Sequence, residues 1–236
     1  MRLLGVLGGM SWTSTEVYYR LLNTGVADRL GGLHSARLVL HSVDFDEIAA
    51  LQHAGDWDGT AEILSAAARG LRAAGAEGLL LATNTMHKVA DTVEAASGLE
   101  VLHIADATAA AVRAHGHTTV GLLATSFTME DAFYVDRLAR HGLEVVVPDA
   151  AGRADVHRII YDELVRDVVR PESRDRYRDV MADLVGSGAE AMVFGCTEIG
   201  LLVASDDTTV PTFDTCRLHA SAAVDWMLAD GPSPRR

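Results

Sequence analysis

A short run of apolar residues that follows a glycine turn and ends in small polar residues occurs twice along the chain. The first copy runs from Ala74 to His87 and the second from Ser187 to Gly200. At a constant offset the two Gly-Ala-Glu triplets align, the apolar runs align, and Thr83 falls on Cys196. Such a run is typical of a strand buried on both faces of a parallel sheet. Because ligands of these sheets bind beyond the carboxyl ends of the strands, we expect Thr83 and Cys196 at equivalent strand ends.

Strands and helices alternate along both halves of the chain. The pattern predicts strands at Leu3–Leu7, Arg37–Val43, Leu79–Ala82, Val101–Ile104, Thr119–Ala124, Leu143–Val147, Met192–Phe194 and Thr209–Phe213. It predicts helices at Asp58–Ala74, Thr85–Ala96, Asp106–His115, His157–Val169, Glu172–Val185 and Cys216–Leu228, and two more that carry Tyr18–Leu22 and Phe133–Leu138. This alternation favours an α/β fold in which each parallel sheet is flanked by helices and joined by right-handed crossovers.

The repeat predicts two similar domains. Around the aligned segments, Gly5 corresponds to Gly121 and Ser11 to Ser126. We assign residues 1–98 and 210–236, with the C-terminal helix, to the first domain and residues 99–209 to the second. Pseudo-two-fold symmetry is expected to turn the two strand ends toward each other across a cleft, where the site would lie. The tail Gly231–Pro234 is expected to be frayed.

Composition limits the partners of the protein. The chain has 236 residues, 49% of them hydrophobic, and a net charge of −13. No stripe of basic residues suggests a nucleic-acid partner, and no apolar run is long enough to span a membrane. Only two cysteines are present, with no metal-ligand spacing. We expect a soluble cytoplasmic protein without metal or structural disulfide. An anionic substrate is compatible with the negative net charge, because helix N-termini and single arginines bind anions locally.

A cleft with one proton-bearing side chain from each half suits a reaction on both faces of one carbon. Racemisation at a Cα is the clearest case, because one group removes the proton and the opposite group returns one. A helix N-terminus favours the thiolate that a basic cysteine needs, and Cys196 stands where a strand ends and a helix begins. Backbone amides at these ends can hold carboxylates and the enolate-like charge that develops.

Three segments carry a family resemblance. Gly8–Trp12, Thr83–His87 and Gly195–Ile199 resemble, in order and spacing, the signatures of the aspartate/glutamate racemase family, and the agreement extends to about Leu228. The resemblance implies cofactor-independent racemisation of an amino acid on two similar α/β domains, usually in a homodimer. It also implies a set of substrate-binding residues, which are Met10, Gln52, Asn84 and Thr85. We add Ser11 and Thr197, which follow the same strand ends.

Two positions depart from the commoner family pattern. Most members have cysteine where this chain has Thr83, and the subgroup with threonine is associated with L-aspartate and L-glutamate. A hydroxyl is a far poorer base than a thiolate, so Cys196 is expected to abstract a proton from one enantiomer while Thr83 mainly donates. Many members also have lysine after Ile-Tyr-x-Glu-Leu, where this chain has Val165 and then Arg166. One residue along a helix turns a side chain by about 100°, so recognition of the substrate carboxylate is expected to differ.

Several site residues have simpler interpretations. Cys196 could be a buried structural thiol, Thr83 a helix cap and Asn84 a turn residue. Cys216 is expected to pack, and His87 to lie beneath the site. The aromatic residues Trp12, Tyr18 and Tyr19 are expected in the core or the cleft wall, and the scattered histidines His34, His41 and His103 do not predict a metal site. Lys88, the single lysine, invites a pyridoxal phosphate Schiff base, but no phosphate cup accompanies it.

Two other functions stay open. A related decarboxylase group uses one cysteine on one face of the substrate, and a weak Thr83 permits this chemistry on a malonate-type acid. The carboxylate cradle predicted at Asn84 and Thr85 argues against it, because the leaving carboxylate needs an apolar pocket. The third function is a non-catalytic, two-lobed protein that closes on a small acid. Gas release, loss of optical rotation and tight binding without turnover distinguish the three.

Overall fold

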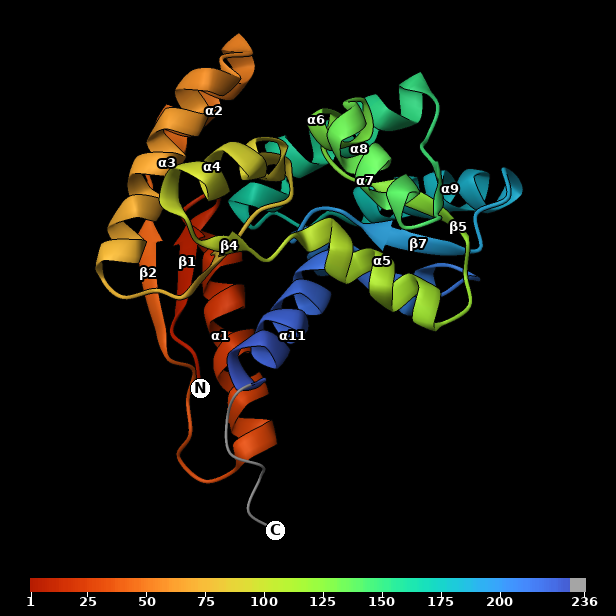
Figure 1. Cartoon of the computed structure of the whole chain (residues 1–236). Coiled ribbons are helices and arrows are strands. Elements are labelled where there is room, and N and C mark those ends of the chain that lie inside the picture. The colour runs from red at the N-terminus through yellow and green to blue at the C-terminus, as the bar shows by residue number, and fades with distance from the viewer. Residues whose placement is uncertain (230–236) are drawn as a thin grey trace. The chain divides into compact units, whose positions relative to one another are not determined.

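Two four-stranded parallel sheets form the framework of the protein. In the computed structural model, which describes residues 1–229, the first sheet contains β1 (Leu4–Gly8), β2 (Leu38–Ser42), β3 (Gly78–Leu81) and β4 (Glu100–Val101), in the order β2-β1-β3-β4 (Figure 1). The second contains β5 (Thr119–Leu123), β6 (Glu144–Val146), β7 (Ala191–Phe194) and β8 (Thr212–Asp214), in the order β6-β5-β7-β8. The strand order is the same in both, which confirms the duplicated α/β fold predicted from the sequence.

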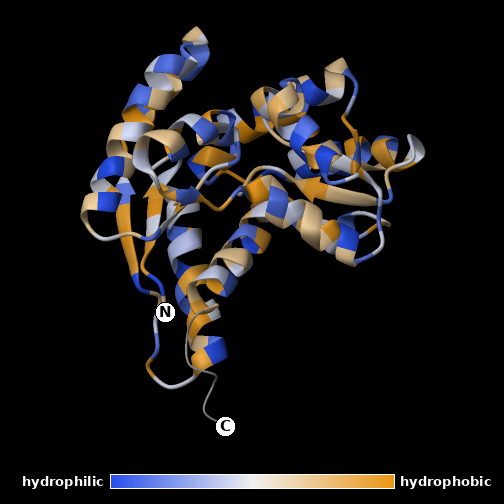
Figure 2. Ribbon diagram, viewed as in Figure 1, coloured by the Kyte–Doolittle hydropathy of each residue, from blue (hydrophilic) through white to orange (hydrophobic). Residues whose placement is uncertain are grey.

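Each sheet belongs to a separate unit of the chain. One unit consists of residues 1–103 and the chain from His219 onward, and the other of Ile104–Leu218. β1 is coloured hydrophobic over much of its length in Figure 2, and β1 and β3 are buried throughout. The tail Gly231–Pro234, predicted to be frayed, lies outside the described residues.

Helices cover both faces of the first sheet. One face carries α2 (Phe45–Ala54), α3 (Trp57–Ala73) and α4 (Ala90–Ser97), whose apolar side chains share a cluster with β1 and β3. The other face carries α1 (Trp12–Leu30) and the end of α11 (Thr215–Leu228), which run side by side in Figure 1. Gly25 of α1 lies against Val224 of α11, and Gly78 of β3 lies against Trp226. The last helix therefore completes the core of the first unit.

The second unit repeats this plan with more interruptions. Its helices are α5 (Ile104–Ala114), α6 (Ser126–Met129), α7 (Ala132–Arg140), α8 (Ala150–Asp162), α9 (Pro171–Gly186) and α10 (Ile199–Leu202). Short 3₁₀ turns occur at η2 (Leu164–Arg166) and η3 (Ser205–Asp207), as at η1 (Thr85–Val89) in the first unit. A single apolar cluster joins β5 and β7 to α8 and α9.

The repeated Gly-Ala-Glu triplet has a structural role in both units. The glycines Gly75 and Gly188 have φ angles of 96° and 98°, in the region that favours glycine, and end the preceding helix. The carboxylate of Glu77 accepts a hydrogen bond of 2.7 Å from the backbone N–H of Leu3. Glu190 accepts the equivalent bond of 2.8 Å from Thr118. Each triplet thus ties the third strand of its sheet to the start of the first.

A second equivalence lies in the first strand of each sheet. A Cβ added to Gly5 would come within 3.4 Å of Leu71 on α3, and one added to Gly121 within 3.1 Å of Leu184 on α9. Glycine at these positions lets the helix approach the strand closely. The predicted correspondence of Gly5 with Gly121 therefore reflects the same helix-on-strand packing.

Three local expectations differ from the structure. Helix α2 was not predicted, and the helix predicted at His157–Val169 ends at Asp162, followed by a 3₁₀ turn and by Asp167 with a φ of 59°. Tyr18 is fully buried as expected, but Trp12 and Tyr19 are exposed by 70% and 54% and are not core residues. They lie on the outer side of α1, whose inner side carries Tyr18 and Leu22.

A buried carboxylate, Asp207, holds the segment after α10 against α9. It accepts hydrogen bonds of 2.8 Å from Arg174 and 2.6 Å from Arg178, and its side chain is fully buried. Burial alone would raise the pKa of this carboxyl, but the arginine and backbone hydrogen bonds outweigh burial and lower the pKa to about 2. In the folded protein Asp207 is therefore mostly ionised at pH values above its pKa.

The Asp207→Asn variant should be less stable at neutral pH. We expect the free energy of unfolding at pH 7 to fall by about 2 kcal/mol, since one partner of a buried charged network is lost. Because the folded-state pKa lies below the ordinary value of 3.8, the difference should be present above about pH 4 and shrink as the pH falls towards 2. Urea unfolding at pH 7 and pH 3 measures it, with Asp206→Asn, an exposed neighbour, as the matched control. An equal loss at both pH values would contradict the assignment.

Candidate active site

The carboxyl ends of β1 and β3 meet at one edge of the first sheet. The two strands are neighbours and parallel, and Leu7 of β1 pairs with Leu81 of β3. The segments that follow them, which begin at Gly9 and Ala82, therefore leave the sheet from the same edge. This geometry brings the predicted residues Met10 and Ser11 to the same sheet edge as Thr83, Asn84 and Thr85.

The segment after β1 is held in a fixed path by its glycines. Gly9 has a φ of 96°, and a Cβ added there would lie 2.2 Å from the carbonyl oxygen of Val43. Its N–H donates a 2.8 Å hydrogen bond to Oγ1 of Thr15. Ser11 then caps α1, its Oγ accepting from the backbone N–H of Ser14 at 3.3 Å. The structure thus gives Ser11 a capping role in addition to its predicted role in the site.

The segment after β3 turns at once into the 3₁₀ helix η1. The backbone N–H of His87 donates to the carbonyl of Asn84 at 3.1 Å. The His87 Nδ1 lies 2.8 Å from the carbonyl oxygen of Thr83, so this nitrogen carries the proton and donates. Asn84 and Thr85 are buried, while Thr83 is partly exposed. His87 is therefore buried against the turn that carries Thr83.

A group of buried rings lies behind this turn. His219 Nε2 is 2.6 Å from the carbonyl oxygen of Leu102 and therefore donates to it. Its Nδ1 is then the acceptor for the Tyr18 hydroxyl at 2.9 Å. Burial, assisted by the nearby His87, lowers the pKa of His219 to about 3, so the ring is neutral at physiological pH. The rings of His87 and His219 are 5.6 Å apart, which connects the turn at Thr83 to the core of the unit.

Gln52 lies on the inner face of α2. It is buried and one helical turn after Ile48, so the two side chains share a face. Ile48 belongs to the same apolar cluster as Met10 and Met86. The unpredicted helix α2 therefore directs Gln52 towards the part of the unit that holds the segments after β1 and β3.

The second unit presents Cys196 and Thr197 at the equivalent sheet edge. They follow β7, whose Phe194 pairs with Leu123 of the neighbouring strand β5. Both side chains are partly exposed. The Cys196 thiol donates a hydrogen bond of 3.0 Å to Oε2 of Glu198, and the Thr197 hydroxyl donates one of 2.6 Å to the same oxygen. Thr83 and Cys196 thus lie two residues beyond the ends of the equivalent third strands, β3 and β7.

The sequence left the protonation state of Cys196 open, and the surroundings of the thiol in the structure now bear on it. Burial raises the pKa of the thiol well above its ordinary value, and the charge and hydrogen bond of Glu198 raise it further. Backbone hydrogen bonds from Thr197 and Glu198 act in the opposite direction but are outweighed. The following helix, α10, spans only Ile199–Leu202, so its dipole is small. These surroundings raise the thiol pKa and favour the protonated form of Cys196.

Where many family members have a lysine, this chain has Val165, which makes apolar contacts. Val165 packs against the apolar core of the second unit, while Arg166 is exposed. Both lie in the 3₁₀ turn η2, where successive side chains are about 120° apart, rather than in the α-helix expected from the sequence. Arg166 therefore points in a direction different from that of Val165.

Lys88 stacks on an aromatic ring. Its Nζ lies 4.2 Å from the centre of the Trp57 ring, a cation–π contact between η1 and α3. This contact accounts for the position of the single lysine in terms of packing. Cys216, expected to pack, is buried, and both cysteines are free thiols.

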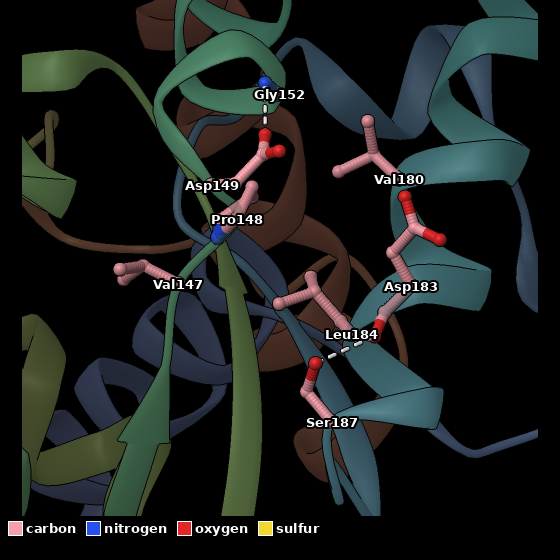
Figure 3. Close-up of a pocket in the computed structure, with 8 residues that line it drawn as sticks. All are labelled: Val147, Pro148, Asp149, Gly152, Val180, Asp183, Leu184 and Ser187. Carbon is pink, nitrogen blue, oxygen red and sulfur yellow. Dashed lines mark hydrogen bonds between the residues drawn. The ribbon is translucent and has the colours of Figure 1, made fainter.

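A cavity of about 420 Å³ opens between α8 and α9 in the second unit (Figure 3). It is lined by Val147, Pro148, Asp149, Gly152, Val180, Asp183, Leu184 and Ser187. Asp149 is engaged with the backbone N–H of Gly152 at 2.7 Å, as the N-cap of α8. None of the predicted site residues lines this cavity, and the chemistry of Cys196 is not connected with it.

Glu198 is the residue that the sequence reasoning missed. It lies inside the Gly195–Ile199 signature, but the sequence analysis gave it no role. An acidic residue directly after Cys-Thr in an apolar stretch indicates a buried carboxyl group close to the cysteine. It is buried, with 6% of its surface exposed. Tyr177 on α9, also buried, lies close enough for the charges of Cys196, Glu163 and Glu198 to act on it. Within residues 1–229 no group of three His, Cys, Asp or Glu side chains is arranged to hold a metal ion.

Comparison with known proteins identifies the family. The architecture first defines a class, a duplicated α/β protein with the same strand order in both sheets. Residues 7–223 match the family model described as Asp/Glu/Hydantoin racemase. The chain therefore belongs to the Asp/Glu/Hydantoin racemase family, in agreement with the resemblance seen in its motifs.

Solved structures agree with this assignment. A crystal structure from Yersinia pestis, provisionally named an Asp/Glu racemase, is 53% identical, with a TM-score of 0.92 over 97% of this chain and 100% of that chain. An aspartate racemase homologue from Pyrococcus horikoshii OT3 is 30% identical, with a TM-score of 0.83 over 96% and 99% of the two chains. A liganded variant of arylmalonate decarboxylase is 13% identical, with a TM-score of 0.56 over 100% and 96%, a likeness of fold alone. No helix among the described residues is long and apolar enough to cross a membrane.

Proposed function

We propose that this protein is a cofactor-independent amino-acid racemase that acts on L-aspartate or L-glutamate. Membership of the Asp/Glu/Hydantoin racemase family supports the reaction class. The observation that carries the proposal is the equivalence of Thr83 and Cys196, each of which follows the third strand of its own sheet. Threonine at the first of these positions is the feature of the subgroup associated with the L-forms of the two acids.

In the proposed mechanism each residue serves one face of the substrate Cα. Cys196 removes the Cα proton of one enantiomer, and Thr83 donates a proton from the opposite side. This assignment requires the two half-sites to close on one substrate molecule. The hydroxyl of Thr83 is a weak base, so the two directions of the reaction are expected to be unequal.

Substrate binding is assigned to polar groups around the two strand ends. Met10, Ser11, Gln52, Asn84 and Thr85 would contribute from the first unit, and Thr197 from the second. Backbone N–H groups at these ends stabilise a carboxylate and the enolate-like charge that forms when the proton leaves. The exposure of Arg166 and the packing of Val165 favour recognition of the side-chain carboxylate by groups other than the family lysine.

The test is exchange at Cα in deuterium oxide. The purified protein, without added cofactor, should replace the Cα–H of L-glutamate or L-aspartate by deuterium and accumulate the D-enantiomer, measured by proton NMR and chiral chromatography. Exchange with D-product supports two-sided chemistry. Binding of both acids without exchange or product would contradict the proposal and favour a non-catalytic binder.

A second candidate is one-faced decarboxylation of a malonate-type acid. The raised pKa of the Cys196 thiol favours this activity, because a protonated thiol can donate to a carbanion. Release of carbon dioxide from a substituted malonate, without racemisation of the acidic amino acids, would identify this activity.

A further inference from the structure

Glu198 joins the Cys196 thiol and the Thr197 hydroxyl through a single oxygen. Its Oε2 accepts from Sγ at 3.0 Å and from Oγ1 at 2.6 Å. An oxygen that accepts from two donors is the ionised or carbonyl oxygen of a carboxyl group, and a thiol donates only while it holds its own proton. The resting arrangement is therefore a thiol that donates to an accepting oxygen of the Glu198 carboxyl group.

We propose that Glu198 takes up the Cys196 proton, so that the two residues act as one proton-relay pair in catalysis. The inference rests on the proposed function only in that the reaction moves a proton at a substrate carbon. Before Cys196 can act as a base, its S–H bond must break. The nearest acceptor in the structure is Glu198 Oε2, which gains the O–H bond while the negative charge passes to sulfur.

The relay balances protons in both directions. A pair with one proton, on Glu198, presents a thiolate that removes the Cα proton and leaves the pair with two protons. A pair with two protons presents a thiol that returns a proton to the Cα carbanion, after which Glu198 re-protonates the sulfur. The pair thus never carries two adjacent negative charges, which would be costly in a buried site. On the opposite face of the substrate, Thr83 is the group that transfers the proton.

Tyr177 is the buried residue on which the charges of Cys196, Glu198 and Glu163 all act. Tyr177 of α9 donates to the carbonyl of Val156 at 3.3 Å, and burial raises its pKa well above the ordinary value, so it remains a neutral phenol. Glu163, after α8, is buried and accepts a 2.6 Å hydrogen bond from Ser173. Arg158 lies 3.3 Å from the same carboxylate. The negative charge closest to the thiol is that of Glu198, whose hydrogen bond and charge raise the thiol pKa.

The pair is tested first without substrate. In a Cys216→Ala background, which leaves Cys196 as the single thiol, the rate of alkylation by iodoacetamide is measured against pH. Glu198→Gln removes the negative charge, so the midpoint of this profile is expected to fall by about one pH unit or more. A midpoint that does not move would overturn the pairing of Glu198 with Cys196.

Turnover then separates a relay from a purely electrostatic neighbour. Glu198→Gln is expected to lower kcat for Cα exchange about 100-fold, with KM changed less than about 3-fold, although its thiolate is more available. Glu198→Asp should recover part of the loss, because a carboxylate is restored. A variant that exchanges faster than the parent at neutral pH would overturn the relay.

Two further arms keep the test decisive. Should Glu198→Gln fail to fold by circular dichroism, Glu198→Asp and Thr197→Val replace it. A relay predicts an intermediate loss of kcat for Cα exchange with Glu198→Asp. It predicts a smaller loss of kcat with Thr197→Val, since the hydrogen bond from the Cys196 thiol to Glu198 is kept. Failure of the parent protein to exchange either acid would overturn the proposed function alone, because the alkylation profile measures the pair independently of any substrate.

Discussion

Cys196→Ala is expected to reduce Cα exchange and racemisation of L-glutamate and L-aspartate by at least about 1000-fold. The thiol is the stronger of the two proposed proton-transfer groups, and a residue that acts directly in both abstraction and return cannot be replaced by a neighbour. Proton NMR in deuterium oxide and chiral chromatography measure the two losses separately. Thermal unfolding should change little, because the side chain is partly exposed and at the end of β7.

Cys216→Ala provides the matched control for this experiment. Cys216 is buried at the start of α11 and has no place in the proposed chemistry. Its replacement should leave kcat within about 2-fold of the parent value and affect mainly stability. Equal activity of the two alanine variants would remove Cys196 from the mechanism.

Thr83→Ala is expected to separate exchange from racemisation. Without the hydroxyl, the second face of the substrate loses its proton donor, so formation of the opposite enantiomer should fall about 100-fold. Deuterium should still enter one enantiomer with retention of configuration, because Cys196 can remove and return a proton on its own face. The ratio of exchange to inversion, measured in one NMR and chromatography series, is the diagnostic quantity.

Two substitutions at the same position sharpen this result. Thr83→Ser keeps the hydroxyl and should preserve inversion to within about 10-fold. Thr83→Cys supplies a stronger base and should make the forward and reverse rates more nearly equal. Equal loss of exchange and inversion in Thr83→Ala would instead indicate that Thr83 positions the segment after β3 and does not transfer a proton.

The strands were the most predictable part of the fold. Their apolar runs are short, most of them end before Gly, Thr or Asp, and each predicted strand is present with its ends shifted. The repeat was informative for a reason that the sequence alone did not show. The Gly75 and Gly188 triplets recur because each ends a helix and anchors its third strand to the first. A structural repeat therefore led to the two equivalent strand ends at which we propose the site.

The site residues were less predictable than the strands because tertiary contacts set their chemistry. Helix α2 was missed, since its apolar and polar residues follow no strong helical period, although Asp44 caps it. The protonation state of Cys196 could not be predicted from the sequence, because it depends on the single-turn helix that follows and on Glu198, which folds back onto the sulfur. An acidic residue two positions after Cys196 shows that a contact is possible, but only the turn after β7 determines that the two side chains meet.

The last helix has a consequence for synthesis of the chain. Residues 104–218 form the second unit without interruption, whereas the first unit needs residues on both sides of them. His219, Val224 and Trp226 complete the core behind Leu102, Gly25 and Gly78. On the ribosome the second unit is thus complete before the first, which stays open at the α1 face until α11 emerges. An early stop before His219 would leave an intact second unit attached to a first unit with an uncovered apolar surface, a substrate for chaperones and proteases.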